Sequence, residues 1–247
     1  CILLRWGEKT ITRYESHQVQ DNAHDVILKK LGSDPEWFLT LLRAARKSFT
    51  LETYAKYFEA GMQLYETDRD IYIKKAVGAK YIRYSDLPEY TGNRRLSLDT
   101  VADMIRYYAN SAQVTGLYKV KLMKMLWYGD ALSYKQRDHA ITGLVYEALP
   151  MGAVPIGYDT FIDLSDICYE EVEIGEGTAY RFLPTDSKEY MHLTREDIFI
   201  LDMVIQRFGR ASKDEIVNAM HQEDAYKKTK PRAIIDFKYA ETIEWPC

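Results

Sequence analysis

The feature that most constrains this chain is a series of helix-capping signals, each followed by apolar residues at helical spacing. Asp34 comes directly before Pro35 and Glu36, so a capping side chain precedes a proline at the first helical position. Ser97 precedes a second run of apolar residues, three or four positions apart, through Ile105 and Tyr108. This pattern predicts a mainly α fold made of helical bundle-like domains.

Further helices are expected from the same two signals. Thr194 with Asp197 and Ser212 with Glu215 have the spacing of a capping box. Asp21 is expected to cap a helix that ends at Leu31, with Gly32 just past its end. The remaining helical patterns cover residues 8–15, 51–77, 117–132 and 140–149. Gly61 and 66–70 are candidate breaks in the second of these.

Only one segment reads clearly as a β-hairpin. Two short extended runs within 172–183 flank the turn Gly175-Glu176-Gly177. Residues 233–237 are expected to form a short extended piece. We therefore expect a helical protein with one small β-hairpin.

The length of 247 residues allows one large domain or two modest ones. Residues 78–96 contain Pro88, Gly92 and Asn93 and few periodic apolar positions, which is typical of a connector. We divide the chain into residues 1–48, a helical connector at 49–96, and a second domain at 97–247. Because the chain begins with Cys1 and not with methionine, we expect a fragment that lacks an N-terminal piece.

The composition limits the function classes. The formal net charge is −4, so any contact with nucleic acid has to be local. The three cysteines form no CxxC pair, which favours a reducing, cytoplasmic location. No apolar run approaches the roughly 20 residues of a membrane helix, and no membrane partner is expected.

Residues 7–15 have the composition of a helix that reads DNA. Lys9, Thr10, Thr12 and Arg13 are expected to face outward as donors to bases and phosphates, while the apolar positions face inward. Any amphipathic surface helix offers a similar outward set. The stretch 6–15 resembles the second half of a Cro/repressor-type (XRE) helix-turn-helix, and this resemblance spans about residues 2–31. It implies operator DNA as a partner of the full-length protein and a homodimer that matches half-sites.

A longer resemblance covers residues 97–243. Six stretches, taken in order, resemble the SocA-like antitoxin domain, also called the Panacea domain: 101–105, 121–128, 142–146, 151–155, 201–208 and 221–229. Ala153 departs from the family pattern, which has proline in a Gly-Pro-Val turn. The resemblance implies a domain that binds a partner protein and has no catalytic role.

The expected helix 117–132 allows two interpretations. In the first, Leu122, Met125 and Leu126 face the core while Lys121 and Lys124 point outward. In the second, exposed aromatic residues anchor a partner. The candidate partner-binding residues are Trp127, Tyr128, Tyr134, His221 and Tyr226.

Enzymatic interpretations have little support. The five histidines show no HExxH or comparable metal spacing, and the chain has no Walker loop, GxGxxG or GxSxG. His221 with Glu223 or Asp224 is the one cluster with acid–base character, and a hydrogen-bonded helix end explains it equally well. We expect no catalytic residue, no metal and no cofactor.

The functional hypothesis is an antitoxin of a type II toxin–antitoxin system that neutralises a cognate toxin by direct binding and represses its own operon. Two alternatives remain open. The chain could be a stand-alone transcriptional regulator whose C-terminal domain senses a ligand or partner. It could also be an adaptor that delivers a toxin to a protease.

Overall fold

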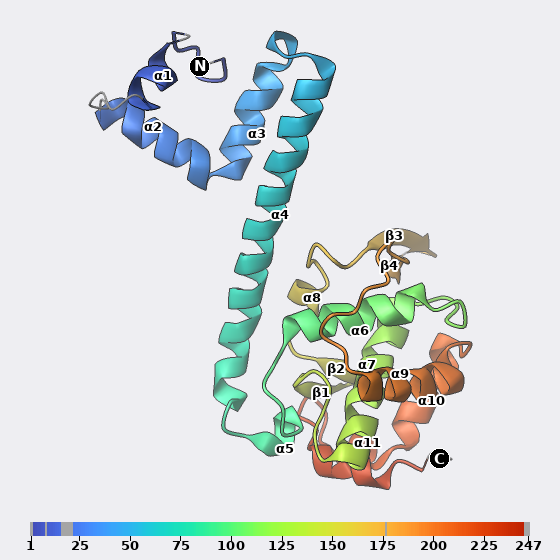
Figure 1. Ribbon diagram of the computed structural model, residues 1–247. Helices are drawn as coiled ribbons and strands as arrows, with labels where there is room; N and C mark the ends of the chain where they lie inside the picture. Colours follow the sequence, from blue (N-terminus) through green and yellow to red (C-terminus); the bar gives the residue numbers. More distant parts are fainter. Residues whose placement is uncertain (1, 8, 16–21, 176, 245–247) are drawn as a thin grey trace. The chain divides into compact units, whose positions relative to one another are not determined.

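The computed structural model describes residues 2–7, 9–15, 22–175 and 177–244, and it confirms the mainly α fold (Figure 1). The chain divides into two compact units, an N-terminal unit, Cys1–Tyr72, and a C-terminal unit, Ile73–Cys247. The division falls within one long helix, α4. Each unit is described by itself.

The N-terminal unit is built from short helices. They are α1 (Thr10–Glu15), α2 (Asn22–Ser33), α3 (Pro35–Ala44), the 3₁₀ turn η1 (Arg46–Ser48) and the first part of α4 (Leu51–Tyr81). Asp34 caps α3 as expected, since its Oδ1 accepts a hydrogen bond from Trp37 N at 2.9 Å. Gly32 does not end α2. The helix continues to Ser33 because Asp34 N still donates to Lys30 O. The expected cap Asp21 lies outside the described residues.

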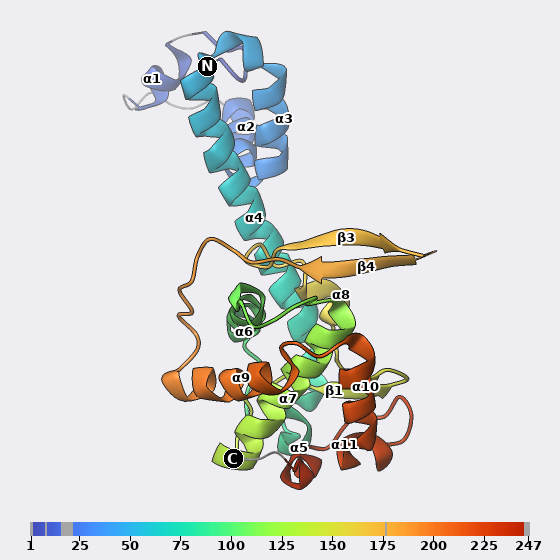
Figure 2. The same cartoon turned by 90° about the vertical axis from the view of Figure 1, so that its right-hand side faces the viewer.

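Helix α4 runs without the breaks expected at Gly61 and 66–70. Gly61 serves packing, because a Cβ there would lie 2.7 Å from Cε1 of Phe38 in α3. Figures 1 and 2 show α3 alongside this part of α4. The connector at 78–96 is also more ordered than expected, because α4 extends to Tyr81 and is followed by η2 (Ile82–Tyr84) and α5 (Pro88–Thr91).

The C-terminal unit is organised around α7 (Lys119–Arg137), which contacts α6, α9, α10, β2 and η3. In Figures 1 and 2, α7 runs through the middle of this unit. Its other helical elements are α6 (Leu98–Asn110), α8 (Tyr158–Phe161), α9 (Arg195–Phe208), α10 (Lys213–Gln222), α11 (Asp224–Lys227) and η3 (Phe237–Thr242). Ser97 caps α6, and both predicted capping boxes are present at the starts of α9 and α10.

The prediction of an amphipathic α7 with outward lysines is wrong. Every residue from 121 to 133 is buried, because neighbouring elements cover α7 on all sides. Lys121 is 2% exposed, and its ammonium donates to the carbonyl oxygens of Thr115 and Gly209, both at 2.8 Å. Lys124 is 1% exposed. These lysines are part of the core, and they do not solubilise an outer face.

The expected hairpin at 172–183 is confirmed as β3 (Tyr169–Ile174) paired antiparallel with β4 (Gly177–Phe182). Figure 2 shows that it extends from one side of the C-terminal unit. A second hairpin, β1 (Tyr146–Leu149) with β2 (Gly152–Pro155), stands where a helix was expected at 140–149. The described part of the chain therefore holds two hairpins and not one.

Long-range pairing stabilises β1 in its extended form. Ile235 N donates to Tyr146 O and Arg232 N donates to Ala148 O, both at 2.8 Å. This pairing confirms the extended piece expected near 233–237, although η3 begins at Phe237. Gly152, at φ 103°, allows the tight turn into β2, where a Cβ would approach Met220.

Candidate partner-binding site

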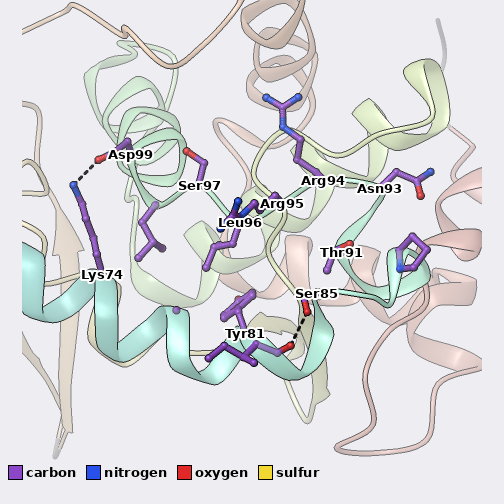
Figure 3. Close-up of a pocket in the computed structure, with 14 residues that line it drawn as sticks. Lys74, Tyr81, Ser85, Thr91, Asn93, Arg94, Arg95, Leu96, Ser97 and Asp99 are labelled. Carbon is purple, nitrogen blue, oxygen red and sulfur yellow. Dashed lines mark hydrogen bonds and ion pairs between the residues drawn. The ribbon is translucent and has the colours of Figure 1, made fainter.

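A cavity of about 880 Å³ opens in the C-terminal unit between the last turns of α4 and the segment 93–99 (Figure 3). We call it the α4 cavity. Its lining includes Lys74, Tyr81 and Ile82 from one side and residues 93–99 from the other. In Figure 3, Leu96 points from the segment towards α4.

The lining of the α4 cavity is positively charged. The lining contains three cations, Lys74, Arg94 and Arg95, and one carboxylate, Asp99. Its formal charge is therefore +2, although the formal net charge of the whole chain is −4. Lys74 Nζ and Asp99 Oδ1 form an exposed ion pair at 2.6 Å. Arg94 and Arg95 are exposed, and within the described ranges neither forms an ion pair. Their charges are therefore available to a ligand.

The floor of the α4 cavity is fixed by Tyr81. This side chain is 6% exposed, and its hydroxyl donates to Ile156 O at 2.9 Å and accepts from Val145 N at 3.3 Å. Burial raises the pKa of Tyr81 well above its usual value, so the phenol stays neutral. Tyr81 thus joins the end of α4 to Val145, just before β1, and Ile156, just after β2.

The wall formed by residues 92–97 is held by backbone contacts with the loop 140–143. Ala140 N donates to Gly92 O at 2.7 Å, and Ser97 N donates to Thr142 O at 3.0 Å. Gly143 has φ 77°, and a Cβ there would lie 2.6 Å from the carbonyl carbon of Arg95. Only glycine fits this close approach of two backbones.

Asp130 on α7 holds the loop 140–143 in place through hydrogen bonds. Its Oδ1 accepts hydrogen bonds from Ile141 N and Thr142 N, both at 2.8 Å, and its Oδ2 accepts from the hydroxyls of Thr142 and Tyr146 at 2.5 and 2.8 Å. Complete burial raises the pKa of Asp130 to about 6, against the opposing effect of these donors. A buried carboxylate therefore sets the position of the cavity wall indirectly.

Two of the predicted partner-binding residues do not reach the surface. Trp127 and Tyr128 are both 0% exposed, because α7 is buried on all sides. The ring centroids of Trp127 and Tyr146 lie 5.1 Å apart, and those of Tyr128 and Phe208 lie 4.6 Å apart. The interpretation of these two rings as exposed anchors is corrected to a core role.

The other three predicted residues are half-buried. Tyr134 lies at the edge of the core, with its ring 5.4 Å from Phe237. His221 and Tyr226 are brought together, with stacked rings 4.3 Å apart, and both hydrogen-bond to Pro150 O in the β1–β2 turn. These two hydrogen bonds hold the β1–β2 turn against α10 and α11.

The N-terminal helix α1 presents a polar outer face. Lys9, Thr12 and Arg13 are exposed and Thr10 is half-buried. Tyr14 faces inward, where its hydroxyl hydrogen-bonds to Nδ1 of His24. Three of the four expected residues are therefore exposed, whereas Thr10 is half-buried like Ile11 and Tyr14, and no residue of α1 is fully buried.

The residues of the α4 cavity were not predicted from the sequence. The adjacent arginines 94 and 95, between Gly92 and the cap Ser97, were a visible signal. The local sequence has only the pattern of a connector, because the contacts that order the segment come from residues more than 40 positions away. In the described part of the chain, no group of three or more metal-binding side chains is placed to hold an ion, and no helix is long and apolar enough to cross a membrane.

Residues 122–227 match the model of a protein family described as "Antitoxin SocA-like, Panacea domain". The match confirms the expected resemblance over these residues, which run from α7 to the end of α11 within the C-terminal unit. Asp130 and Gly143 lie inside the match, whereas the cavity lining at 74–99 precedes it. No curated protein and no solved structure matches the chain significantly.

Proposed function

We propose that this protein is the antitoxin of a type II toxin–antitoxin pair and that its C-terminal part neutralises a cognate toxin by direct contact. The observation that carries the proposal is the match of residues 122–227 to the SocA-like antitoxin family. We assign this role to the C-terminal unit, Ile73–Cys247, which contains both the domain expected at 97–247 and the α4 cavity. Its partner is a protein, the toxin.

The geometry of the C-terminal unit supports protein binding. A large buried core fixes the surface around it, and a pre-formed cavity with tyrosine and arginine side chains opens on that surface. Both residue types are enriched in the central, energetically dominant parts of protein interfaces. A rigid surface of this kind binds a partner with a small ordering cost.

Co-expression with the product of the adjacent gene tests the proposal. We expect that gene to arrest growth when induced alone and to be tolerated when this chain is induced with it. A neighbour that is harmless alone, or that remains lethal beside this chain, would contradict the antitoxin role. Degradation of the toxin that depends on this chain and a protease would instead support the adaptor alternative.

We also propose that α1 contacts operator DNA in the full-length protein, through Lys9, Thr10, Thr12 and Arg13. The exposure of Lys9, Thr12 and Arg13 supports this role, as does the inward contact of Tyr14 with His24. Repressors of this type bind as dimers to paired half-sites, so we propose a homodimer. Light scattering of the full-length protein tests the oligomeric state.

A further inference from the structure

The α4 cavity combines an apolar floor with two arginines that form no ion pair within the described residues. Tyr81 lies buried at the floor, while Ile82 at the opening is 73% exposed. Arg94 extends away from α4 at the rim in Figure 3, and Arg95 is the next residue along the same wall. The cavity thus combines an exposed isoleucine from α4 with two exposed arginines from the facing wall, an amphipathic lining that suits an apolar side chain flanked by carboxylates.

The rim that carries the arginines is already in a defined conformation. Asn93, at φ 55°, has the left-handed backbone that asparagine tolerates, and its Nδ2 donates to Asp138 O at 2.8 Å. The close approach of Gly143 to the backbone of Arg95 fixes the next residues. Because this wall is held before a partner arrives, binding does not have to order it.

We infer that the α4 cavity binds an acidic segment of the toxin, with one apolar side chain over Tyr81 and Ile82 and carboxylates against Arg94 and Arg95. This inference rests on the proposed function. Charge complementarity selects the occupant, because the cavity has a formal charge of +2 and its one carboxylate, Asp99, already pairs with Lys74.

A nucleic acid fits this surface less well than an acidic peptide. A duplex would extend beyond the cavity over a chain whose formal net charge is −4, where its phosphates would be repelled. A short acidic segment needs only the local cations. We therefore treat nucleic-acid binding at this site as a competing outcome of the test.

The test uses the full chain with Arg94→Glu and Arg95→Glu together. The matched control carries Lys188→Glu and Arg210→Glu, which reverse two exposed cations of the same unit outside the cavity lining. Neutralisation is scored by growth during co-expression with the toxin, and affinity is measured by titration calorimetry with a variant of the toxin that no longer arrests growth. We expect the cavity variant to bind at least about tenfold more weakly at low salt and the control to bind within about twofold of the unaltered chain.

Circular dichroism and the melting temperature show whether each variant folds. A second pair, Arg94→Gln and Arg95→Gln, removes the charges without reversing them and is expected to give an intermediate loss. Restoration of growth supplies the sharpest result. Toxin variants in which single surface Asp or Glu residues are replaced by Lys are co-expressed with the Arg94→Glu, Arg95→Glu chain, and cells that grow are selected. We expect the toxin substitutions that restore neutralisation to cluster in one segment of the toxin.

The outcomes separate the two proposals. If the unaltered chain does not neutralise the toxin, the proposed function is wrong. If it neutralises the toxin and the folded cavity variant does so equally well, the antitoxin role stands and the inference about the cavity is overturned. Loss of binding to a labelled oligonucleotide with neutralisation intact would likewise overturn it and assign the arginines to nucleic acid.

Discussion

Lys124 lies in the core with an ammonium group that makes no hydrogen bond within the described residues. Desolvation lowers its pKa from 10.5 to about 8. Below pH 8 the lysine is charged in both the folded and the unfolded chain, and its burial costs about 3 kcal/mol. Between pH 8 and 10.5 the unfolded chain binds more protons, so the free energy of unfolding rises with pH in this range.

We predict that Lys124→Met stabilises the protein. Methionine keeps the length of the side chain and removes the buried charge, so the free energy of unfolding at pH 7 should increase by about 1–3 kcal/mol. The increase should shrink between pH 8 and 10.5. Urea denaturation across this pH range measures both effects.

Lys121→Met is the matched control for that variant. It removes the donor to Thr115 O and Gly209 O, so we expect it to lower the free energy of unfolding by about 1–3 kcal/mol. Equal destabilisation by both substitutions would show that Lys124 has a partner comparable to those of Lys121.

Asp130 titrates with the opposite consequence for stability. Its pKa is about 6 in the fold and 3.8 as the ordinary value, so the folded chain binds more protons between these pH values. The contribution of Asp130 to the free energy of unfolding therefore falls as pH rises from about 4 to 6. We predict that Asp130→Asn removes this fall, because the amide does not titrate.

The measurement compares urea denaturation of the unaltered chain and Asp130→Asn at pH 4, 5, 6 and 7. The difference in free energy of unfolding between the unaltered chain and Asp130→Asn should change by about 3 kcal/mol from pH 4 to pH 7. Asp130→Ala, which leaves the N–H groups of Ile141 and Thr142 without an acceptor, should destabilise by a similar amount or more at every pH. An unchanged pH dependence in Asp130→Asn would exclude titration of this carboxyl in that window.

At the scale of elements, the sequence predicts structure set by neighbouring residues, such as helix caps, but not structure that depends on pairing between distant segments. The caps Asp34, Ser97, Thr194 and Ser212 were identified from spacing because each bonds to a backbone N–H three residues away. The helix expected at 140–149 was wrong because the extended form of β1 depends on pairing with residues 232–235, far along the chain. An apolar run alone does not distinguish a buried strand from a buried helix.

The same reasoning explains which site residues were missed. The wall of the α4 cavity is set by Asp130 and Gly143, which act through backbone contacts that no sequence pattern near Arg94 reveals. Trp127 was expected as an anchor because aromatic side chains suit both a core and an interface. Its burial follows only from the elements that surround α7.

Gly143 tests how strongly the loop 140–143 controls the cavity wall. We predict that Gly143→Ala lowers the free energy of unfolding by about 2–4 kcal/mol, since the new methyl group meets the backbone of Arg95 at a residue with positive φ. Gly78→Ala is the control. It lies inside α4 with nothing within 4 Å of the added Cβ, and it should stabilise by about 0.5–1 kcal/mol. Thermal denaturation of both variants measures the contrast, and a neutral Gly143→Ala would show that the wall can shift freely.

At the scale of the whole molecule, the proposed DNA-contacting residues and the proposed toxin-contacting residues belong to different compact units. Lys9 and Arg13 lie in the N-terminal unit, whereas Arg94 and Arg95 lie in the C-terminal unit. Each unit has its own internal contacts, so a surface substitution in one unit should leave the folding of the other unchanged. The two activities should therefore be separable by mutation.

We predict a double dissociation in the full-length protein. Lys9→Ala with Arg13→Ala should weaken operator binding and reduce its salt dependence by about one unit of slope for each phosphate that the side chains no longer neutralise, while toxin neutralisation is unchanged. Arg94→Glu with Arg95→Glu should weaken toxin binding at least about tenfold, reduce neutralisation, and leave operator binding within about twofold of the unaltered protein. Gel shifts at several salt concentrations and growth during co-expression measure the two effects. If either pair changes both activities, the assignment of one partner to each unit has to be revised. Substitutions of exposed charges in two independent units should each affect one activity, so a shared effect would mean that the units are energetically coupled.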